Sequence, residues 1–189
     1  MSVLRANAID TSRWGKEGPT KTVARLYGEI RDGEAGLAVF KGNLTRFVWR
    51  SQAMIFHTDE DGDILFLAEG PQTFATGFVR EHDRVISMSE KVRRLKHESY
   101  KAGLVRGIRE ELGIRRVNPR LLSLIREDRT RKASSTSYPG LAVRSRAHVY
   151  LWEMHAKHFK PDGYVEVARE KTTTCNWRAW DGPLPAPLK

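Results

Sequence analysis

The sequence is poor in cysteine, and Cys175 is the only one in the chain. This excludes an intramolecular disulfide and a zinc site built on four cysteines. No apolar run approaches the ~20 residues that a membrane-spanning helix needs. The N-terminal residues also lack the apolar stretch of a secretory signal. Together these absences predict a protein without a membrane span in a reducing, cytoplasmic compartment.

Acidic residues are in deficit, with 23 Asp and Glu against 33 Lys and Arg, for a net charge of +10. Such a balance favours polyanionic partners: a phosphate-bearing small molecule, RNA or an anionic surface. The basic residues are densest in segments 91–96, 115–120 and 126–132. Solvated basic faces need no partner, however, so charge alone leaves specific nucleic-acid binding open.

The length of 189 residues fits one elaborated domain. We expect a polar, flexible arm over residues 1–22, one domain over residues 23–182 and a proline-rich tail over residues 183–189. A hairpin turn is predicted at Asp61-Gly62, and a polar loop over residues 129–139. Composition predicts strands at residues 23–30, 37–40, 46–49, 53–57, 64–68, 78–79, 85–88, 121–125, 147–154, 164–167 and 172–180.

One segment has a helical pattern. Apolar residues recur every four positions at Leu104, Ile108 and Leu112, with Val105 beside them and Gly113 directly after. This is an apolar stripe with a glycine stop, which predicts a helix from about residue 99 to residue 112. Strands on both sides of one central helix indicate a mixed α/β or α+β domain.

The polar face of this predicted helix carries candidate chemistry. At 100° per residue, positions 106, 107, 110 and 111 share one sector of the helix. Glu110 and Glu111 therefore project close together and could hold a hard cation such as Mg²⁺. Such a cation neutralises phosphate oxygens and activates water, and Arg106 would orient the carboxylates. Taken alone, an exposed Arg-Glu-Glu face is the commoner interpretation.

The fuller pattern over residues 98–114 resembles the metal-binding box of Nudix hydrolases. That box is a glycine, five residues, a glutamate, seven residues, and then Arg-Glu-aliphatic-any-Glu-Glu-any-Gly-aliphatic. Seven residues separate Glu98 from Arg106, as the box requires. The other matching positions are Ile108, Glu110, Glu111, Gly113 and Ile114.

Two positions depart from the box. Val92 stands where the opening glycine belongs, and Gly107 stands where the glutamate of Arg-Glu belongs. In the family that glutamate binds metal or acts in catalysis, and a glycine inside a helix costs about 1 kcal/mol relative to alanine. The site is either degenerate, or it binds metal through the remaining carboxylates and takes its base from elsewhere. Glu166 is our candidate base, and an exposed strand glutamate is the alternative.

The resemblance implies a Nudix fold of the α/β (α+β) class, with a mixed sheet packed against helices in an α/β/α sandwich. It implies a pyrophosphohydrolase, dependent on Mg²⁺ or Mn²⁺, acting on nucleoside diphosphates linked to another group. Glu98, Glu110 and Glu111 would hold the metal, and Arg106 would orient them. Substrate contacts are assigned to Arg129, Tyr138 and Trp177, although a solvated loop and core aromatics are the ordinary interpretations of such residues.

A second hypothesis is a catalytically impaired Nudix-fold protein that binds RNA or a nucleotide, within a ribonucleoprotein assembly. Gly107, Val92 and the charge of +10 favour it. The sequence does not choose between the two hypotheses. It also leaves open which nucleotide is bound and whether the protein forms a homodimer.

Overall fold

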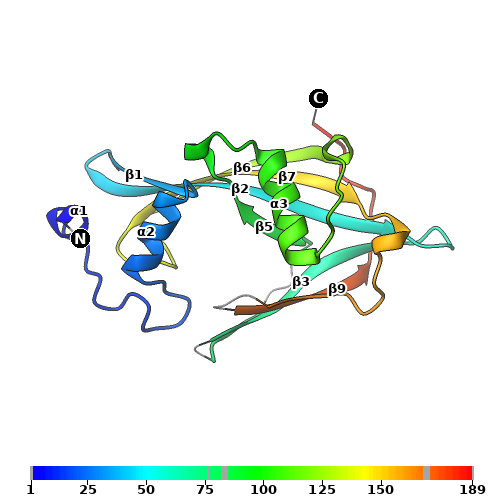
Figure 1. Cartoon of the computed structure of the whole chain (residues 1–189), viewed down its shortest axis with the longest axis horizontal. Coiled ribbons are helices and arrows are strands. Elements are labelled where there is room, and N and C mark those ends of the chain that lie inside the picture. Colours follow the sequence, from blue (N-terminus) through cyan, green and yellow to red (C-terminus); the bar gives the residue numbers. More distant parts are fainter. Residues whose placement is uncertain (1, 76, 82–84, 168–170, 189) are drawn as a thin grey trace. The chain divides into compact units, whose positions relative to one another are not determined.

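A computed structural model describes residues 2–75, 77–81, 85–167 and 171–188 (Figure 1). The chain divides into two compact units. Unit 1 comprises Met1–Arg50, Lys91–Ser99 and Asp128–Ala147, and unit 2 comprises Ser51–Glu90, Tyr100–Glu127 and His148–Lys189. The expected single domain over residues 23–182 stays a prediction. No helix in the described part of the chain is both long and apolar enough to span a membrane.

Unit 1 combines short helices with the ends of long strands. Its elements are α1 (Ser2–Ala6), α2 (Val23–Arg31), β1 (Ala35–Phe40), η1 (Arg94–Lys96) and parts of β2 (Asn43–Thr58), β6 (Ser123–Lys132) and β7 (Ala142–Glu153). Strands β1 and β2 form an antiparallel hairpin, in which Ala35 lies opposite Val48 and Phe40 opposite Asn43.

The strand predicted at residues 23–30 is wrong, because this segment is helix α2. The Thr22 side chain caps the helix by accepting a hydrogen bond from the backbone N–H of Arg25, at 3.1 Å. Val23, Leu26 and Ile30 follow a helical spacing and pack in the core of the unit. A favourable cap and core packing therefore outweigh the β-type composition of the segment.

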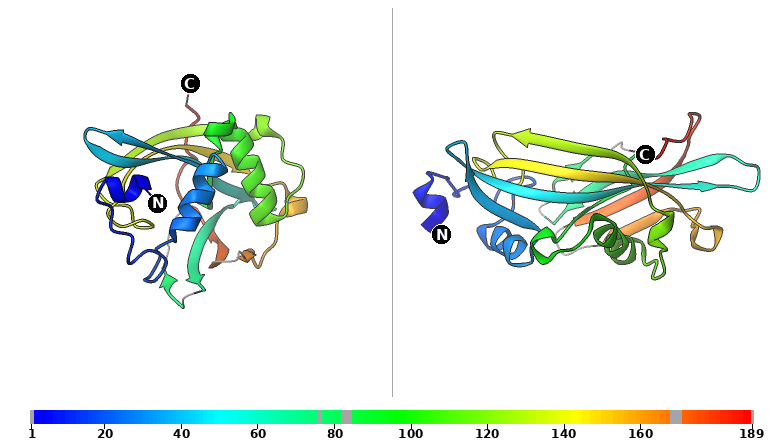
Figure 2. Two further views of the ribbon diagram at one scale, coloured as in Figure 1. Left: turned by 60° about the vertical axis from the view of Figure 1, so that its left-hand side comes forward. Right: turned by 90° about the horizontal axis from the view of Figure 1, so that it is seen from above.

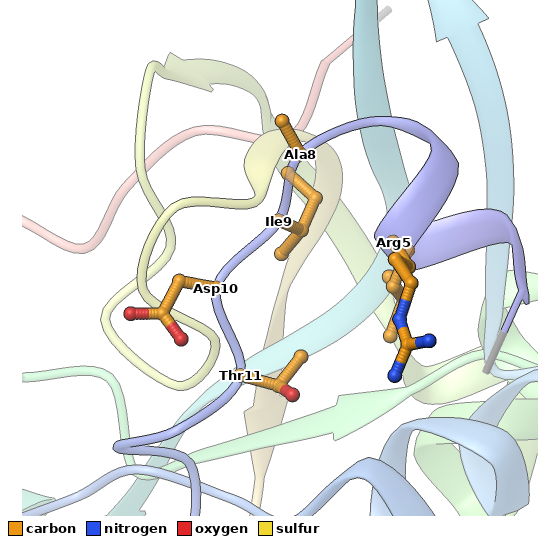
Figure 3. A pocket seen from close by; sticks show the side chains of 6 residues that line it. Arg5, Ala8, Ile9, Asp10 and Thr11 are labelled. Carbon is orange, nitrogen blue, oxygen red and sulfur yellow. The ribbon is translucent and has the colours of Figure 1, made fainter.

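The core of unit 1 includes residues from the expected N-terminal arm. Leu4 and Trp14 are buried with Leu26, Leu44, Tyr138 and Leu141. The indole N–H of Trp14 donates to the carbonyl of Pro139 at 3.0 Å, which ties the segment down. Beside α1 lies a hollow of about 310 Å³ (Figure 3), lined by Leu4, Arg5, Ala8, Ile9, Asp10 and Thr11.

Unit 2 is a sheet with one α-helix. Its strand order is β6-β7-β2-β3-β9-β8, with β4 beside β3 and β5 beside β2. The predicted hairpin is confirmed, since Phe56 of β2 lies opposite Phe66 of β3 and Gly62 has a φ of 88°. The remaining elements are β3 (Ile64–Phe74), β4 (Val79–Arg80), β5 (Met88–Lys91), α3 (Tyr100–Leu112), η2 (Pro119–Leu121), η3 (Ala156–His158), β8 (Tyr164–Val167) and β9 (Lys171–Ala179).

The helix predicted up to residue 112 is confirmed as α3, and it packs on one face of the unit 2 sheet (Figure 2). Leu104 and Ile108 are fully buried there. The other face carries a separate apolar cluster that includes Met54, Phe56 and Trp180. The described part of unit 2 therefore has a helix on one face only, so the mixed α and β class holds without the three layers of an α/β/α sandwich.

The predicted loop over residues 129–139 and the predicted start of the next strand are both corrected by the structure. Residues 129–132, expected within a polar loop, belong to β6, and β7 begins at Ala142, five residues before its predicted start. Both extensions lie in unit 1. Because the extended ends are rich in arginine, their polarity concealed their strand conformation.

Candidate functional site

Helix α3 sets the orientation of the candidate side chains. Its apolar stripe is buried against the unit 2 sheet, and this fixes the rotation of the helix. Arg106 and Glu111 lie at the border of the stripe and are partly buried, whereas Glu110 is exposed. The Arg106 guanidinium lies 3.4 Å from the Glu110 carboxylate one turn later.

Gly107 faces strand β5. A Cβ atom built at this position would lie 2.9 Å from the Cβ of Glu90 and 2.9 Å from the Cε of Met88. The Glu90 side chain therefore runs through the space that a side chain at position 107 would enter. Its carboxylate is 3.0 Å from the Arg106 guanidinium. A carboxylate thus lies next to Arg106 although α3 has a glycine at position 107.

Strands β3, β8 and β9 bring further polar groups to the face that α3 covers. Cys175 of β9 packs in the same core cluster as Leu104 and Ile108. Glu69 of β3 lies opposite Cys175 in the sheet, and register partners project to the same face. Thr173, two residues before Cys175, projects there too and lies opposite Glu166 of β8.

The electrostatics of this face are dominated by negative charge. Burial raises the pKa of Glu111 to about 8, and the nearby carboxylates of Glu166, Glu90 and Glu69 raise it further, against the opposing effect of Lys171. The pKa of the Cys175 thiol is raised to about 12 by burial and by the carboxylates of Glu69, Glu111 and Glu166. We name Glu69, Glu90, Glu111 and Glu166 the acidic cluster.

Basic and polar side chains pair with members of the acidic cluster. Arg106 pairs with Glu90 at 3.0 Å and Lys171 with Glu166 at 3.3 Å. Glu69 accepts a hydrogen bond from the Gln72 amide at 2.6 Å. The four carboxylates of the acidic cluster can supply oxygen ligands of the kind that Mg²⁺ and Mn²⁺ require.

One buried hydroxyl strengthens this fit. Thr173 is 3% exposed, and its Oγ1 has no hydrogen-bond partner among the described residues. A buried polar atom without a partner is costly unless water or an ion satisfies it. The side chains present therefore fit a hydrated divalent cation. Within the described ranges, no three acidic, histidine or cysteine side chains already converge to metal-ligand geometry.

The sequence-predicted residues separate between the units. Arg106, Glu110, Glu111, Glu166 and Trp177 belong to unit 2, whereas Glu98, Arg129 and Tyr138 belong to unit 1. The Glu98 carboxylate accepts a hydrogen bond from the backbone N–H of Arg93 at 2.7 Å. Tyr138 is fully buried against Trp14, which gives its ring a packing role.

Both the indole N–H and the ring of Trp177 have partners within the protein. Its indole N–H donates to the carbonyl of Lys160 at 2.7 Å, and its ring packs against Phe159 at 4.9 Å between centroids. The ring is only partly exposed. Its place in the sheet is therefore explained without a ligand.

Glu90 and Glu69 were missed in the sequence. Each is a single glutamate in a strand of otherwise ordinary composition. Glu69 lies far from the box, and Glu90 lies two residues before its opening position, outside the motif. One indirect signal was present in the sequence. Gly107 has no side chain although it lies in the middle of a helix, which indicates that a neighbouring segment approaches closely there. It does not say which residue approaches.

No protein-family model matches this sequence, and no curated protein is recognisably similar to it. The family resemblance therefore rests on residues 98–114, and the chemistry must be argued from the geometry of the acidic cluster.

Proposed function

We propose that the protein is a divergent Nudix-type pyrophosphohydrolase that acts on nucleoside diphosphates linked to another group. The observation that carries this proposal is the Glu90 side chain in the space beside Gly107. It supports a site in which a strand supplies the carboxylate that the box has lost. The mixed α and β class of the fold is compatible with the Nudix assignment.

In this proposal, residues of unit 2 have separate roles in cation binding and in catalysis. Glu111 and Glu90 would hold the cation, and Arg106 orients the Glu90 carboxylate through its 3.0 Å contact. Bound Mg²⁺ or Mn²⁺ would neutralise phosphate oxygens and lower the pKa of a coordinated water. Glu166 would accept a proton from the attacking water, and Lys171 holds its carboxylate in place through an ion pair at 3.3 Å. Glu110 is exposed and serves mainly to position Arg106.

Turnover of a nucleotide panel tests this assignment. The panel comprises a nucleotide sugar, a dinucleoside polyphosphate, a deoxynucleoside triphosphate and a capped RNA, each with Mg²⁺, with Mn²⁺ and with chelator. Glu90→Gln and Glu111→Gln should each lower turnover about 100-fold or more, because each removes a carboxylate that would ionise when it binds the cation. Glu60→Gln, in an exposed turn of the same unit, should leave turnover unchanged.

A relocation experiment separates Glu90 from a merely structural residue. Glu90→Ala should be inactive, and Gly107→Glu alone should disturb the packing because the two side chains compete for one space. Glu90→Ala with Gly107→Glu moves the carboxylate onto α3 and should recover part of the turnover. A folded but inactive double variant would overturn the role of Glu90. A folded wild-type protein that is silent across the panel would overturn the hydrolase.

A further inference from the structure

Unit 1 contains a hollow of about 380 Å³ with an unusual lining. Its walls come from three neighbouring strands in the order β6-β7-β2. None of the described residues that line it is acidic. They are Phe47, Val48, Trp49, Arg129, Thr130, Arg131, Arg144, Ser145 and Arg146.

The arginines occur in pairs at alternate positions of a strand. Arg129 and Arg131 are two residues apart on β6, and Arg144 and Arg146 are two residues apart on β7. Residues at i and i+2 of a strand project to one face, about 7 Å apart. Adjacent strands are separated by about 5 Å. All four arginines line the hollow, so their guanidinium groups lie in a small area and can attract a ligand with several negative charges.

Aromatic rings continue this face on β2. Phe47 and Trp49 are also two residues apart and partly exposed. Phe47 meets Phe40 of β1 edge-on, with centroids 6.4 Å apart. The Arg144 guanidinium lies over the Phe40 ring at 4.1 Å. These contacts hold rings and guanidinium planes side by side, so that the surface offers stacking partners together with positive charge.

We infer that this face of unit 1, the basic hollow, binds single-stranded nucleic acid. The arginines contact phosphates, and the rings of Phe47 and Trp49 stack against bases. Aromatic platforms beside a positively charged groove bind single strands with little sequence preference. A patch for an inorganic polyanion would need the cations but not the rings. This binding is independent of the metal chemistry proposed for unit 2.

Fluorescence anisotropy with a labelled 12-residue oligouridine tests the inference, with chelator present so that hydrolysis is silent. If the four arginines contact phosphates, the logarithm of affinity should fall with the logarithm of salt concentration with a slope of about −3. Arg129→Ala with Arg131→Ala should reduce that slope by about 1.4. Both side chains are exposed, so the fold should survive.

The matched control removes the same charge elsewhere. Arg115→Ala with Arg116→Ala, both exposed in unit 2, should leave affinity and slope near the wild-type values. Equal losses in the two double variants would overturn the inference, because net charge alone would then explain binding. Absence of oligouridine binding by the wild type at low salt would overturn it as well.

Phe47→Leu tests the rings and keeps an apolar side chain in place. It should weaken oligouridine binding roughly tenfold and leave binding of inorganic polyphosphate unchanged. If both ligands bind Phe47→Leu as well as they bind wild type, the hollow is an anion site only and the inference fails. The same measurement with a labelled oligothymidine distinguishes DNA from RNA. Equal affinity for oligothymidine and oligouridine means that either single strand is a ligand, and tighter binding of oligouridine indicates RNA.

Discussion

Each unit contains a glutamate among charged neighbours, and the two glutamates have opposite surroundings. Glu29 in unit 1 is 1% exposed and contacts Arg46, Lys91 and Lys21. Burial alone would raise its pKa, but these three cations outweigh burial and lower the pKa to about 2. Glu111 in unit 2 is surrounded mainly by carboxylates, and its pKa is raised to about 8.

The difference separates a structural ion cluster from a candidate site. Around Glu29 three cations offset the charge of the carboxylate, so this glutamate needs no ligand. Around Glu111 burial and like charges act in the same direction, and the structure tolerates the resulting cost. Perturbation of this kind concentrates at functional sites. Three measurements of stability test this contrast.

The largest expected effect is on stability at neutral pH. Glu29→Gln should lower the free energy of unfolding by about 3–5 kcal/mol, because it leaves Arg46 and Lys91 buried or partly buried without their shared carboxylate. Glu111→Gln should change it by less than about 1 kcal/mol, because a group with a pKa near 8 is already mostly protonated at pH 7. Urea denaturation followed by tryptophan fluorescence measures both.

An exposed ion pair supplies the control for that comparison. Glu17 pairs with Arg13 at 2.5 Å, but both side chains are more than half exposed. Glu17→Gln should therefore cost well under about 1 kcal/mol. If Glu111→Gln were as destabilising as Glu29→Gln, the acidic cluster would be a structural element and the contrast between the units would fail.

The second effect is the acid sensitivity that Glu29 confers. Its pKa falls from an ordinary 4.5 to about 2 in the folded protein, so its contribution is complete above pH 4.5 and is lost as pH falls toward 2. Between pH 6 and pH 3 this amounts to about 2 kcal/mol. Lys21, whose pKa burial lowers to about 8, stays protonated throughout this window and adds no slope.

A comparison of wild type with Glu29→Gln isolates this contribution. The stability gap between the two proteins should narrow by about 2 kcal/mol when urea denaturation is repeated at pH 3 instead of pH 6. A constant gap would mean that Glu29 keeps an ordinary pKa and that its three cations do not act on it.

Local patterns in the sequence predicted several elements of the fold. The four-residue spacing from Leu104 to Leu112 predicted α3, and the Asp61-Gly62 turn predicted the hairpin of β2 and β3, because both depend on neighbours in the chain. Helix α2 was missed because its β-type composition outweighed two local signals, the cap residue Thr22 and the helical spacing of Val23, Leu26 and Ile30. The burial of Leu26 and Glu29 by partners from distant segments also supports the helix, and composition alone could not reveal those partners.

The candidate site was predictable only on the helix. Spacing placed Arg106, Glu110 and Glu111 on one sector of α3, but it could not add Glu90 and Glu69. Those two reach the acidic cluster through strand register and the packing of α3 on β5. Such contacts depend on the tertiary fold, and a single strand glutamate leaves no periodic trace in the sequence.

The smallest effect concerns two glycines inside helices. A Cβ added at Gly28 of α2 would meet nothing within 4 Å, so Gly28→Ala should raise the free energy of unfolding by up to about 1 kcal/mol through helix propensity. At Gly107 of α3 the same methyl would lie 2.9 Å from Glu90 and Met88. Gly107→Ala should lose this gain and destabilise the protein by about 1 kcal/mol, because the strand side chains must move.

Turnover distinguishes the two glycines further. Gly28→Ala should leave hydrolysis unchanged, whereas Gly107→Ala should reduce it because the Glu90 carboxylate is displaced from Arg106. Thermal unfolding and the turnover assay on the same two variants give both readouts. If Gly107→Ala were stabilised and fully active, the space beside α3 would hold a methyl group without displacing Glu90. The close fit of Glu90 against the glycine would then no longer support a site there.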